Sequence, residues 1–230
     1  MANLSEPEEV LYHFLRSRLS EITRTGVANR LSSANETFDG TGAQTAFVLN
    51  TIPDSIVTVT VNTVEVYPYK DFDIDLDNKT ITFNTAPASG TDNVSITYKT
   101  GSSWIFPDTP RDDLKKNSYP RIAVIPITES SQQQSIAEDD TYDTITFQLD
   151  ILSYKDQECT IGGASKYDND VSRYLARQVK KTIKSDWRLY MNNKLFQPVF
   201  LSNNPVPFEP AKNVFRNMIE INFNAFNTGE

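Results

Sequence analysis

The spacing of apolar residues changes twice along this 230-residue chain, and this change limits the folds that the chain can adopt. Residues 5–24 repeat apolar side chains about every 3.6 positions, as an amphipathic helix does. Residues 36–102 alternate apolar and polar side chains, which is the period of a half-buried strand. Both periods occur after residue 102. We therefore predict an α+β domain built from residues 1–35 and 103–230, with an inserted all-β domain at 36–102.

The middle segment has the pattern of a small all-β sandwich. In Ile56–Val61, valines alternate with threonines, so one face should be buried, and Asn62-Thr63 then predicts a hairpin turn. The segment holds three Lys against nine Asp or Glu, a net charge of −6. Such an acidic surface should repel nucleic acid. The predicted strands are Thr45–Leu49, Ile56–Val61, Val64–Tyr67, Phe72–Leu76, Thr80–Phe83 and Val94–Tyr98.

The flanking sequence predicts an antiparallel sheet with packed helices. Ser5 and Glu8 form a capping box for the first helix, and Gly26 is a stop signal. The polar residues 129–142 predict a mobile loop. The other predicted elements are a possible hairpin of Arg121–Thr128 with Thr144–Leu152, a helix at Tyr167–Asp186, and strands at Phe196–Phe200 and Val214–Phe226.

The sequence contains no group of residues that indicates an enzyme. His13 is the only histidine and Cys159 the only cysteine, so a site with two histidine ligands and an intrachain disulfide are both excluded. His13 lies beside the apolar stripe of the first helix, where a packing or surface role is the simpler interpretation. Cys159 has no motif around it and is expected to be a small buried apolar residue. We predict that the protein is not an enzyme and uses no cofactor.

An acidic strand allows a metal-binding interpretation. Asp75, Asp77 and Asn78 could bind calcium, because the oxygen ligands of calcium loops also recur at alternate positions. The glycine that such a loop needs for its sharp turn is absent, and apolar residues separate the acids. A strand with acids outward and apolar residues inward is the simpler alternative.

The second predicted helix carries a row of basic residues. This row could line a channel that DNA crosses. Alternatively it is a solvated helix face, partly paired with acids, and Asp168, Asp170 and Asp186 flank it. The basic residues are Arg173, Arg177, Lys180, Lys181 and Lys184.

The chain shows no sign of membrane insertion or export. No apolar run approaches the roughly 18 residues of a membrane span. Residues 1–9 are polar and acidic and lack the basic and apolar regions of a secretion signal. We expect a soluble protein that assembles in a cytoplasm and has no membrane partner.

The order of elements outside 36–102 is informative. A helix with the sequence EEVLYHFLRSRL is followed by WIFPDTP, YPRIAV, the strand TITFQLDILSY and a basic amphipathic helix. This order resembles the tail-terminator or tail-completion proteins of long-tailed viruses, and the lengths between elements depart from that family only at 36–102. The resemblance implies a hexameric ring at the neck of the virion. One face would meet the tail-tube protein and the other the head-connector or stopper protein. Genome DNA would pass through the lumen without sequence-specific binding.

The middle segment carries a second and more specific set of motifs. These are the FVL strand, the VTVN turn, a D-x-D strand, ITF, AP-x-x-G-T and a closing V-x-I-x-Y strand. They resemble a β-sandwich module found in phage tail, fibre and neck proteins. That module usually has glycine after VN, whereas Thr63 stands there in this chain.

The first resemblance also implies roles for individual residues. The sheet would form the inner wall of the ring, with Glu220, Asn222 and Asn224 facing the lumen and the basic helix behind the sheet. The sandwich would lie outside. The alternative is a baseplate or fibre-base component whose sandwich binds host-surface glycan, which exposed aromatic residues would favour. The residues expected to form contacts between copies are Arg121, Ile122, Val124, Thr144, Thr146, Gln148, Ile219 and Ile221.

Overall fold

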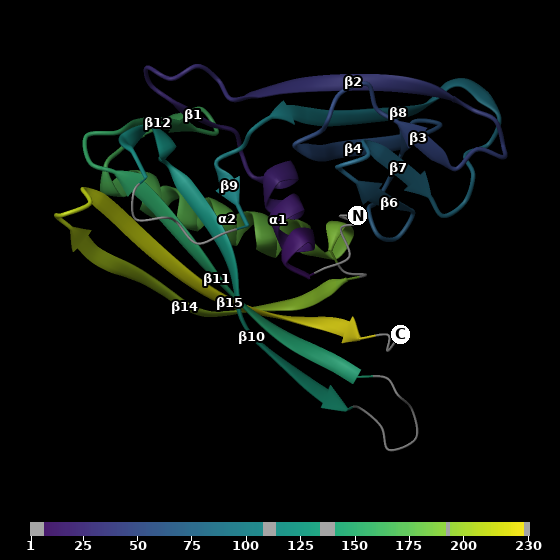
Figure 1. Ribbon diagram of the computed structural model, residues 1–230. Helices are drawn as coiled ribbons and strands as arrows, with labels where there is room; N and C mark the ends of the chain where they lie inside the picture. The colour runs from purple at the N-terminus through teal and green to yellow at the C-terminus, as the bar shows by residue number, and fades with distance from the viewer. Residues whose placement is uncertain (1–6, 108–113, 134–140, 192–193, 228–230) are drawn as a thin grey trace.

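The computed structural model describes residues 7–107, 114–133, 141–191 and 194–227 (Figure 1). Within these ranges the chain is mostly β, with two α-helices and four sheets, so it is α+β overall. Residues 31–101 form two of the sheets. The helices and the other two sheets come from the residues on either side of that stretch, and we call this part the body.

A five-stranded sheet is the centre of the body, and both helices pack on one of its faces. On β11 the side chains of Ile145, Phe147 and Leu149 point toward the helices and are buried, and the Phe147 ring lies 5.9 Å from that of Phe223. The sheet order is β14 (Leu195–Glu209), β15 (Val214–Asn227), β11 (Thr141–Tyr154), β10 (Arg121–Gln133) and β9 (Ile105–Phe106), and the helices are α1 (Pro7–Arg18) and α2 (Asn169–Tyr190).

Residues 31–101 form two facing sheets with a core of their own. Phe47, Phe72, Ile81 and Ile96 are among the buried side chains between them, so both inner faces are covered. The first sheet has the order β2 (Leu31–Gly40), β8 (Gly90–Gly101), β4 (Ser55–Val61) and β5 (Val64–Val66); the second has the order β3 (Ala46–Val48), β7 (Thr80–Phe83) and β6 (Phe72–Asp75). We call this part the sandwich.

Most predicted elements are present. The six strands predicted between residues 45 and 98 each coincide with a strand, and Asn62-Thr63 forms the turn between β4 and β5. Arg121–Thr128 pairs with Thr144–Leu152, as predicted. The second predicted helix is present as α2, but it begins at Asn169 and extends to Tyr190, and Tyr167 belongs to a strand. These elements were predictable because each has a regular apolar period.

The end of the first helix was predicted wrongly. The helix α1 ends at Arg18, and Ile22–Arg24 forms a short strand, β1. Ile22 fits the helical stripe, but it pairs with Ile161 in a small sheet of β1, β12 (Glu158–Ile161) and β13 (Ala164–Tyr167). Tertiary pairing therefore overrides the helical period here. Ser5, the predicted cap, lies outside the described residues.

Three strands contain polar residues that the prediction left outside strands. The strand β2 was not predicted, because LSSANETFDG has few apolar residues, yet it pairs with β8 along its length. Residues 129–142 were predicted to be a mobile loop, but β10 continues to Gln133 and β11 begins at Thr141, so that prediction is wrong at both ends. Residues 134–140 lie outside the described residues. In both cases backbone pairing forms the strand without an apolar pattern.

Candidate assembly surfaces

One face of the five-stranded sheet carries a row of polar side chains, on the side away from the helices. Thr144, Thr146 and Gln148 of β11 lie directly opposite Asn224, Asn222 and Glu220 of β15, respectively. The hydroxyl of Thr144 donates to Oδ1 of Asn224 at 3.2 Å. All six side chains are partly exposed. We call this set the polar row. It shows that residues expected at the ring contact and residues expected at the lumen share one face.

The apolar residues expected at contacts between copies are not on that face. Ile122, Val124, Ile219 and Ile221 are fully buried in the core under the helices, because they alternate with the outward-facing residues. Their side chains are therefore not on the surface of the single chain, and the expected contact between copies stays a prediction. Arg121 is also largely buried, with its guanidinium 3.7 Å from the centre of the Phe106 ring.

The backbone edges of the sheet lie at β14 and β10. In the described part of the chain, β14 pairs only with β15, and β9 covers β10 only at Ile122 and Ala123. The strand Val214–Asn227, expected to supply contacts, lies inside the sheet between β14 and β11. Its backbone groups are therefore already paired. A neighbouring copy could pair only with β14 or with the later part of β10.

The edge strands β14 and β10 both expose large apolar side chains. Val199 and Leu201 of β14 are 55% and 53% exposed, and Ile127 of β10 is 45% exposed. Pro198 and Pro205 bound the residues 199–204, each of which has a backbone N–H. This proline-free stretch is the part of β14 best suited to strand pairing.

The basic helix lies on the other side of the sheet from the polar row. Val171, Leu175 and Val179 of α2 are buried against the sheet, while Arg173 and Arg177 are exposed. The ammonium groups of Lys180 and Lys184 lie over the ring of Phe200. The helix therefore packs behind the sheet, as expected, and its basic residues do not contribute to the polar row.

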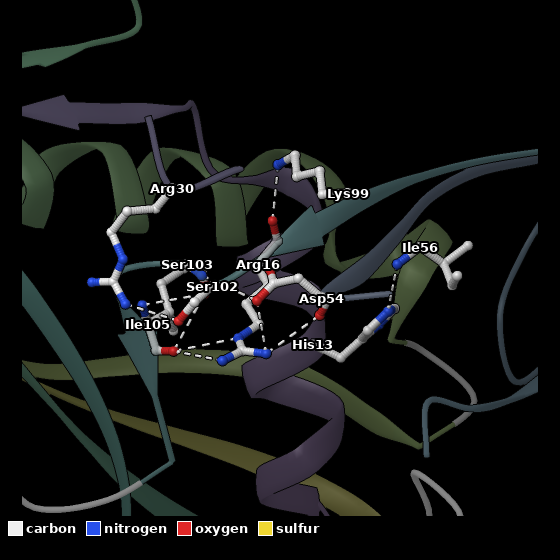
Figure 2. A network of polar contacts seen from close by, with 9 residues as sticks. All are labelled: His13, Arg16, Arg30, Asp54, Ile56, Lys99, Ser102, Ser103 and Ile105. Carbon is white, nitrogen blue, oxygen red and sulfur yellow. Dashed lines mark hydrogen bonds and ion pairs between the residues drawn. The ribbon is translucent and has the colours of Figure 1, made fainter. Parts of the chain in front are cut away.

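An ion pair between Arg16 and Asp54 connects the body to the sandwich (Figure 2). The guanidinium of Arg16, on α1, lies 3.1 Å from Oδ1 of Asp54, at the start of β4. The same guanidinium donates to the carbonyl of Ile105, on β9, at 3.1 Å and 3.3 Å. The ammonium of Lys99, on β8, donates to the carbonyl of Arg16 at 2.9 Å. Arg16 thereby joins the helix, the sandwich and the sheet of the body.

His13 belongs to the same junction. It is buried, and its Nε2 accepts a hydrogen bond from the backbone N–H of Ile56 at 3.0 Å. Burial, together with the charges of Arg16 and Lys99, lowers the pKa of His13 to about 3. The imidazole is therefore neutral near pH 7 and acts as an acceptor. This supports the packing interpretation of the only histidine.

A second contact joins the sandwich to both helices. The Arg18 guanidinium lies 3.6 Å from the centre of the Tyr190 ring and donates to the carbonyl of Val57 at 3.2 Å. The hydroxyl of Tyr190 donates to the carboxylate of Glu65 at 2.7 Å. Several polar contacts therefore join the sandwich to the body. They could not be predicted from the sequence, because the partners are far apart in the chain and follow no period.

The candidate calcium ligands form an ordinary turn. Asp75 accepts hydrogen bonds from the backbone and the side-chain amide of Asn78, at 2.9 Å and 2.7 Å. These bonds lower the pKa of the Asp75 carboxyl. Asp77 is exposed. Within the described residues, no group of three or more His, Cys, Asp or Glu side chains is placed to hold a metal ion.

Cys159 lies in the core of the body, as predicted. It is fully buried, and burial raises the pKa of its thiol to about 12. A thiol with such a pKa is almost entirely protonated near pH 7, so it is a poor nucleophile.

Comparisons with known proteins do not identify this chain. A scan against protein-family models and a search of curated proteins both found no match. No helix in the described ranges is long and apolar enough to cross a membrane.

Proposed function

We propose that this protein is a structural virion subunit, a tail terminator or tail-completion protein that forms a ring at the neck. Its body has helices packed on a sheet that is antiparallel except for β9, which pairs in parallel with β10, and this is close to the arrangement that the family resemblance implies. The sandwich would be the inserted domain. The observation that carries the proposal is the arrangement of the sheet. One face is covered by helices, the other carries the polar row, and the two edges are unequal.

Unequal edges permit head-to-tail association. The β14 edge of one copy can pair with the β10 edge of the next copy, and this contact forms a ring when the rotation from copy to copy closes. The exposed Val199 and Leu201 would then be covered by the neighbour. The corrected contact surface is therefore residues 199–204 of one copy and Ile127–Gln133 of the next.

The polar row supports a role around DNA. Glu220, Asn222 and Asn224 would face the lumen, with Thr144, Thr146 and Gln148 beside them on the same wall. Amide and hydroxyl groups with a single carboxylate offer no cationic contact to phosphates, so DNA could pass without sticking. The exposed arginines of α2 would lie outside this wall. The tail-tube protein and the head-connector protein would then bind the two rims of the ring.

The sandwich offers little support for the alternative function. A baseplate or fibre-base protein that binds host glycan would be expected to expose aromatic rings there. In the described residues, Phe47, Phe72, Phe83 and Tyr98 of the sandwich are buried, and its exposed large apolar residues are Val48, Ile52 and Val64. We therefore propose an assembly role, without catalysis or a cofactor.

A substitution at the β14 edge tests the ring. Leu201→Lys places a charge on the proposed contact, and we expect it to convert rings into monomers in sedimentation and native mass measurements. Ile52→Lys is the matched control, since Ile52 is 64% exposed, against 53% for Leu201, but lies on the sandwich. In virions, microscopy should place six copies at one axial level just below the head. A location at the distal tail tip, or equal behaviour of the two variants, would contradict the proposal.

A further inference from the structure

The exposed face of α2 carries a row of cations. Five basic side chains are spaced three or four positions apart, so they lie on one face of the helix, and all five are exposed. From the first to the last of them the helix rises by about 22 Å. We call this row the basic stripe. Its members are Arg173, Arg177, Lys181, Lys184 and Arg188.

The basic stripe has no carboxylate partner within the described part of the chain. None of its five side chains forms an ion pair there, although the whole chain has a net charge of −8. Burial and the charge of Lys184 lower the pKa of the adjacent Lys180. Like charges three or four positions apart on a helix repel one another. An acidic surface placed against the stripe would therefore relieve this repulsion.

The sandwich has an outer sheet face of the opposite charge. Its second sheet, β3-β7-β6, buries Phe72 and Ile74 on the inner side, so Asp73 and Asp75 point outward. The side chains opposite these two acids on β7 and β3 are small and at least partly exposed. We call this surface the acidic face. Its members are Ala46, Val48, Asp73, Asp75, Thr80 and Thr82.

The two surfaces match in charge and in spacing. Alternate residues of a strand are about 7 Å apart, and residues four positions apart on a helix are about 6 Å apart. A helix laid along β6 therefore places Asp73 and Asp75 beside two successive cations of the stripe. Neither carboxylate forms an ion pair in the described residues. Asp75 accepts hydrogen bonds from Asn78, but a carboxylate has lone pairs left for a cation.

We propose that the basic stripe of one copy binds the acidic face of the neighbouring copy. The inference rests on the proposed ring, in which β10 of one copy pairs with β14 of the next. The sandwich is fixed to the body at β9, beside β10, where Arg16 donates to the carbonyl of Ile105. On α2, Lys180 and Lys184 lie over Phe200 of β14. The strand pairing would therefore bring the sandwich of one copy toward α2 of the next.

The arrangement of the single chain agrees with this contact. Figure 1 shows the sandwich and α2 on the same side of the five-stranded sheet. Neighbouring sheets that continue one another would keep both on that side. The contact would add ion pairs to the apolar contact at the strand edges.

A protein surface suits the stripe better than nucleic acid does. Tyr167, just before α2, and Leu189, next to Arg188, are 60% and 52% exposed. Arginine together with exposed aromatic and apolar side chains is typical of protein interfaces. The net charge of −8 would repel DNA, whereas a neighbouring sandwich held by the ring is present at a high effective concentration.

A charge swap tests the contact in the full-length protein. The stripe variant is Arg177→Glu/Lys181→Glu, and the face variant is Asp73→Lys/Asp75→Lys. Each variant alone brings like charges together, so we expect association between copies to weaken at least about tenfold in sedimentation. In an equal mixture, the acidic stripe of one variant meets the basic face of the other. Association should then return to within about threefold of the wild-type value.

A matched control changes the charge elsewhere. Lys115→Glu/Lys155→Glu alters the net charge as the stripe variant does, at exposed positions away from α2, and should change association less than about twofold. Wild-type association of the stripe variant or the face variant would overturn the inference. A mixture that associates no better than its components would also overturn it, and it cannot be explained by misfolding if each variant keeps its circular dichroism.

Leu201→Lys separates this inference from the ring. If Leu201→Lys dissociates the copies but the mixture shows no recovery, the strand-edge contact stands and the stripe contact fails. If Leu201→Lys has no effect but the mixture recovers, the stripe contact stands and the strand-edge contact fails. Labelled duplex DNA tests the other class of partner. Binding of DNA that the stripe variant loses, with unchanged association between copies, would assign the stripe to nucleic acid and overturn the inference.

Discussion

The sandwich and the body bury their apolar side chains in different ways. In the sandwich, two sheets face each other, so both inner faces are covered within residues 31–101. In the body, α1 and α2 cover only one face of the five-stranded sheet, and the polar row and two backbone edges remain accessible. The sandwich therefore buries its apolar faces by itself, whereas the body has surfaces that a partner could cover. Apolar assembly contacts are therefore expected on the body.

The two parts are nevertheless joined by polar contacts. Arg16 and Arg18 reach from α1 to the sandwich, and Tyr190 does so from α2. A ring subunit with this construction would hold the sandwich at a fixed angle. Some substitutions should therefore affect the stability of one part alone, and others the stability of both.

The largest effect is expected in the core of the body. Phe147→Asp places a charge among fully buried side chains and removes a large ring, which should cost more than about 4 kcal/mol of stability. The body should lose its fold while the sandwich, with its own core, keeps its β-structure in circular dichroism and proteolysis. In infected cells we expect heads with abnormal or unjoined tails. Simultaneous unfolding of both parts would show that the sandwich depends on the body.

A smaller effect is expected at the junction. Asp54→Asn leaves the partly buried Arg16 without its charged partner, and removal of one member of such a pair costs about 3 kcal/mol. Because the pair joins both parts, amide exchange should accelerate in β4 and in β9. Asp77→Asn is the control: Asp77 is exposed, so urea unfolding should show a change within about 0.5 kcal/mol. Equal stability of the two variants would mean that the junction contributes little.

His13 should make the stability of the protein depend on pH. Its pKa is about 3 in the folded protein and about 6.5 when unfolded, so between these values the unfolded chain binds the extra proton. Stability should fall by about 1.4 kcal/mol per pH unit as the pH drops from about 6 toward 3. His13→Gln can keep an acceptor for Ile56 without the titration. Urea unfolding from pH 7 to 4 should show a shallower loss in this variant, and parallel curves would contradict the assignment.

The spacing of apolar residues along the sequence correctly predicted strands, a helix and the outward face of a strand. The strands between residues 45 and 98, the stripe of α2 and the common outward face of Glu220, Asn222 and Asn224 all follow from alternation or helical spacing. The same alternation, applied to β10, places Ile122 and Val124 in the core. The expectation that these two residues contact a neighbour therefore ignored a signal that was present in the sequence.

Other features could not be predicted from a pattern. The strand β2 is polar and depends on backbone pairing with β8, and the pair of Arg16 with Asp54 joins residues 38 positions apart. The order β14-β15-β11-β10-β9, which decides which strands are edges, depends on tertiary pairing. The edge strands of the candidate assembly surface could therefore be identified only from the structure. The side chains of the polar row could be identified from the sequence.

The smallest expected effect concerns the turn between β4 and β5. Asn62 and Thr63 both have positive φ, 50° and 69°, as the predicted two-residue hairpin turn requires. A β-branched residue is strained in this conformation by roughly 1–2 kcal/mol, whereas glycine is not, although glycine also loses more entropy on folding. Thr63→Gly should therefore stabilise the sandwich by about 0.5–1 kcal/mol and leave the body unchanged. Thermal unfolding followed separately in the two parts would measure this.

A second substitution separates strain from hydrogen bonding at the same position. The hydroxyl of Thr63 donates to the carbonyl of Asn62 at 2.5 Å, and glycine would lose that bond. Thr63→Ala loses the same bond but keeps a Cβ in the left-handed region, so it should be no more stable than the wild-type protein. If Thr63→Gly behaves like Thr63→Ala, the hydroxyl outweighs the strain. If glycine instead raises the unfolding temperature of the body as well, the junction transmits stability from the sandwich, and the two parts are less independent than their separate cores indicate.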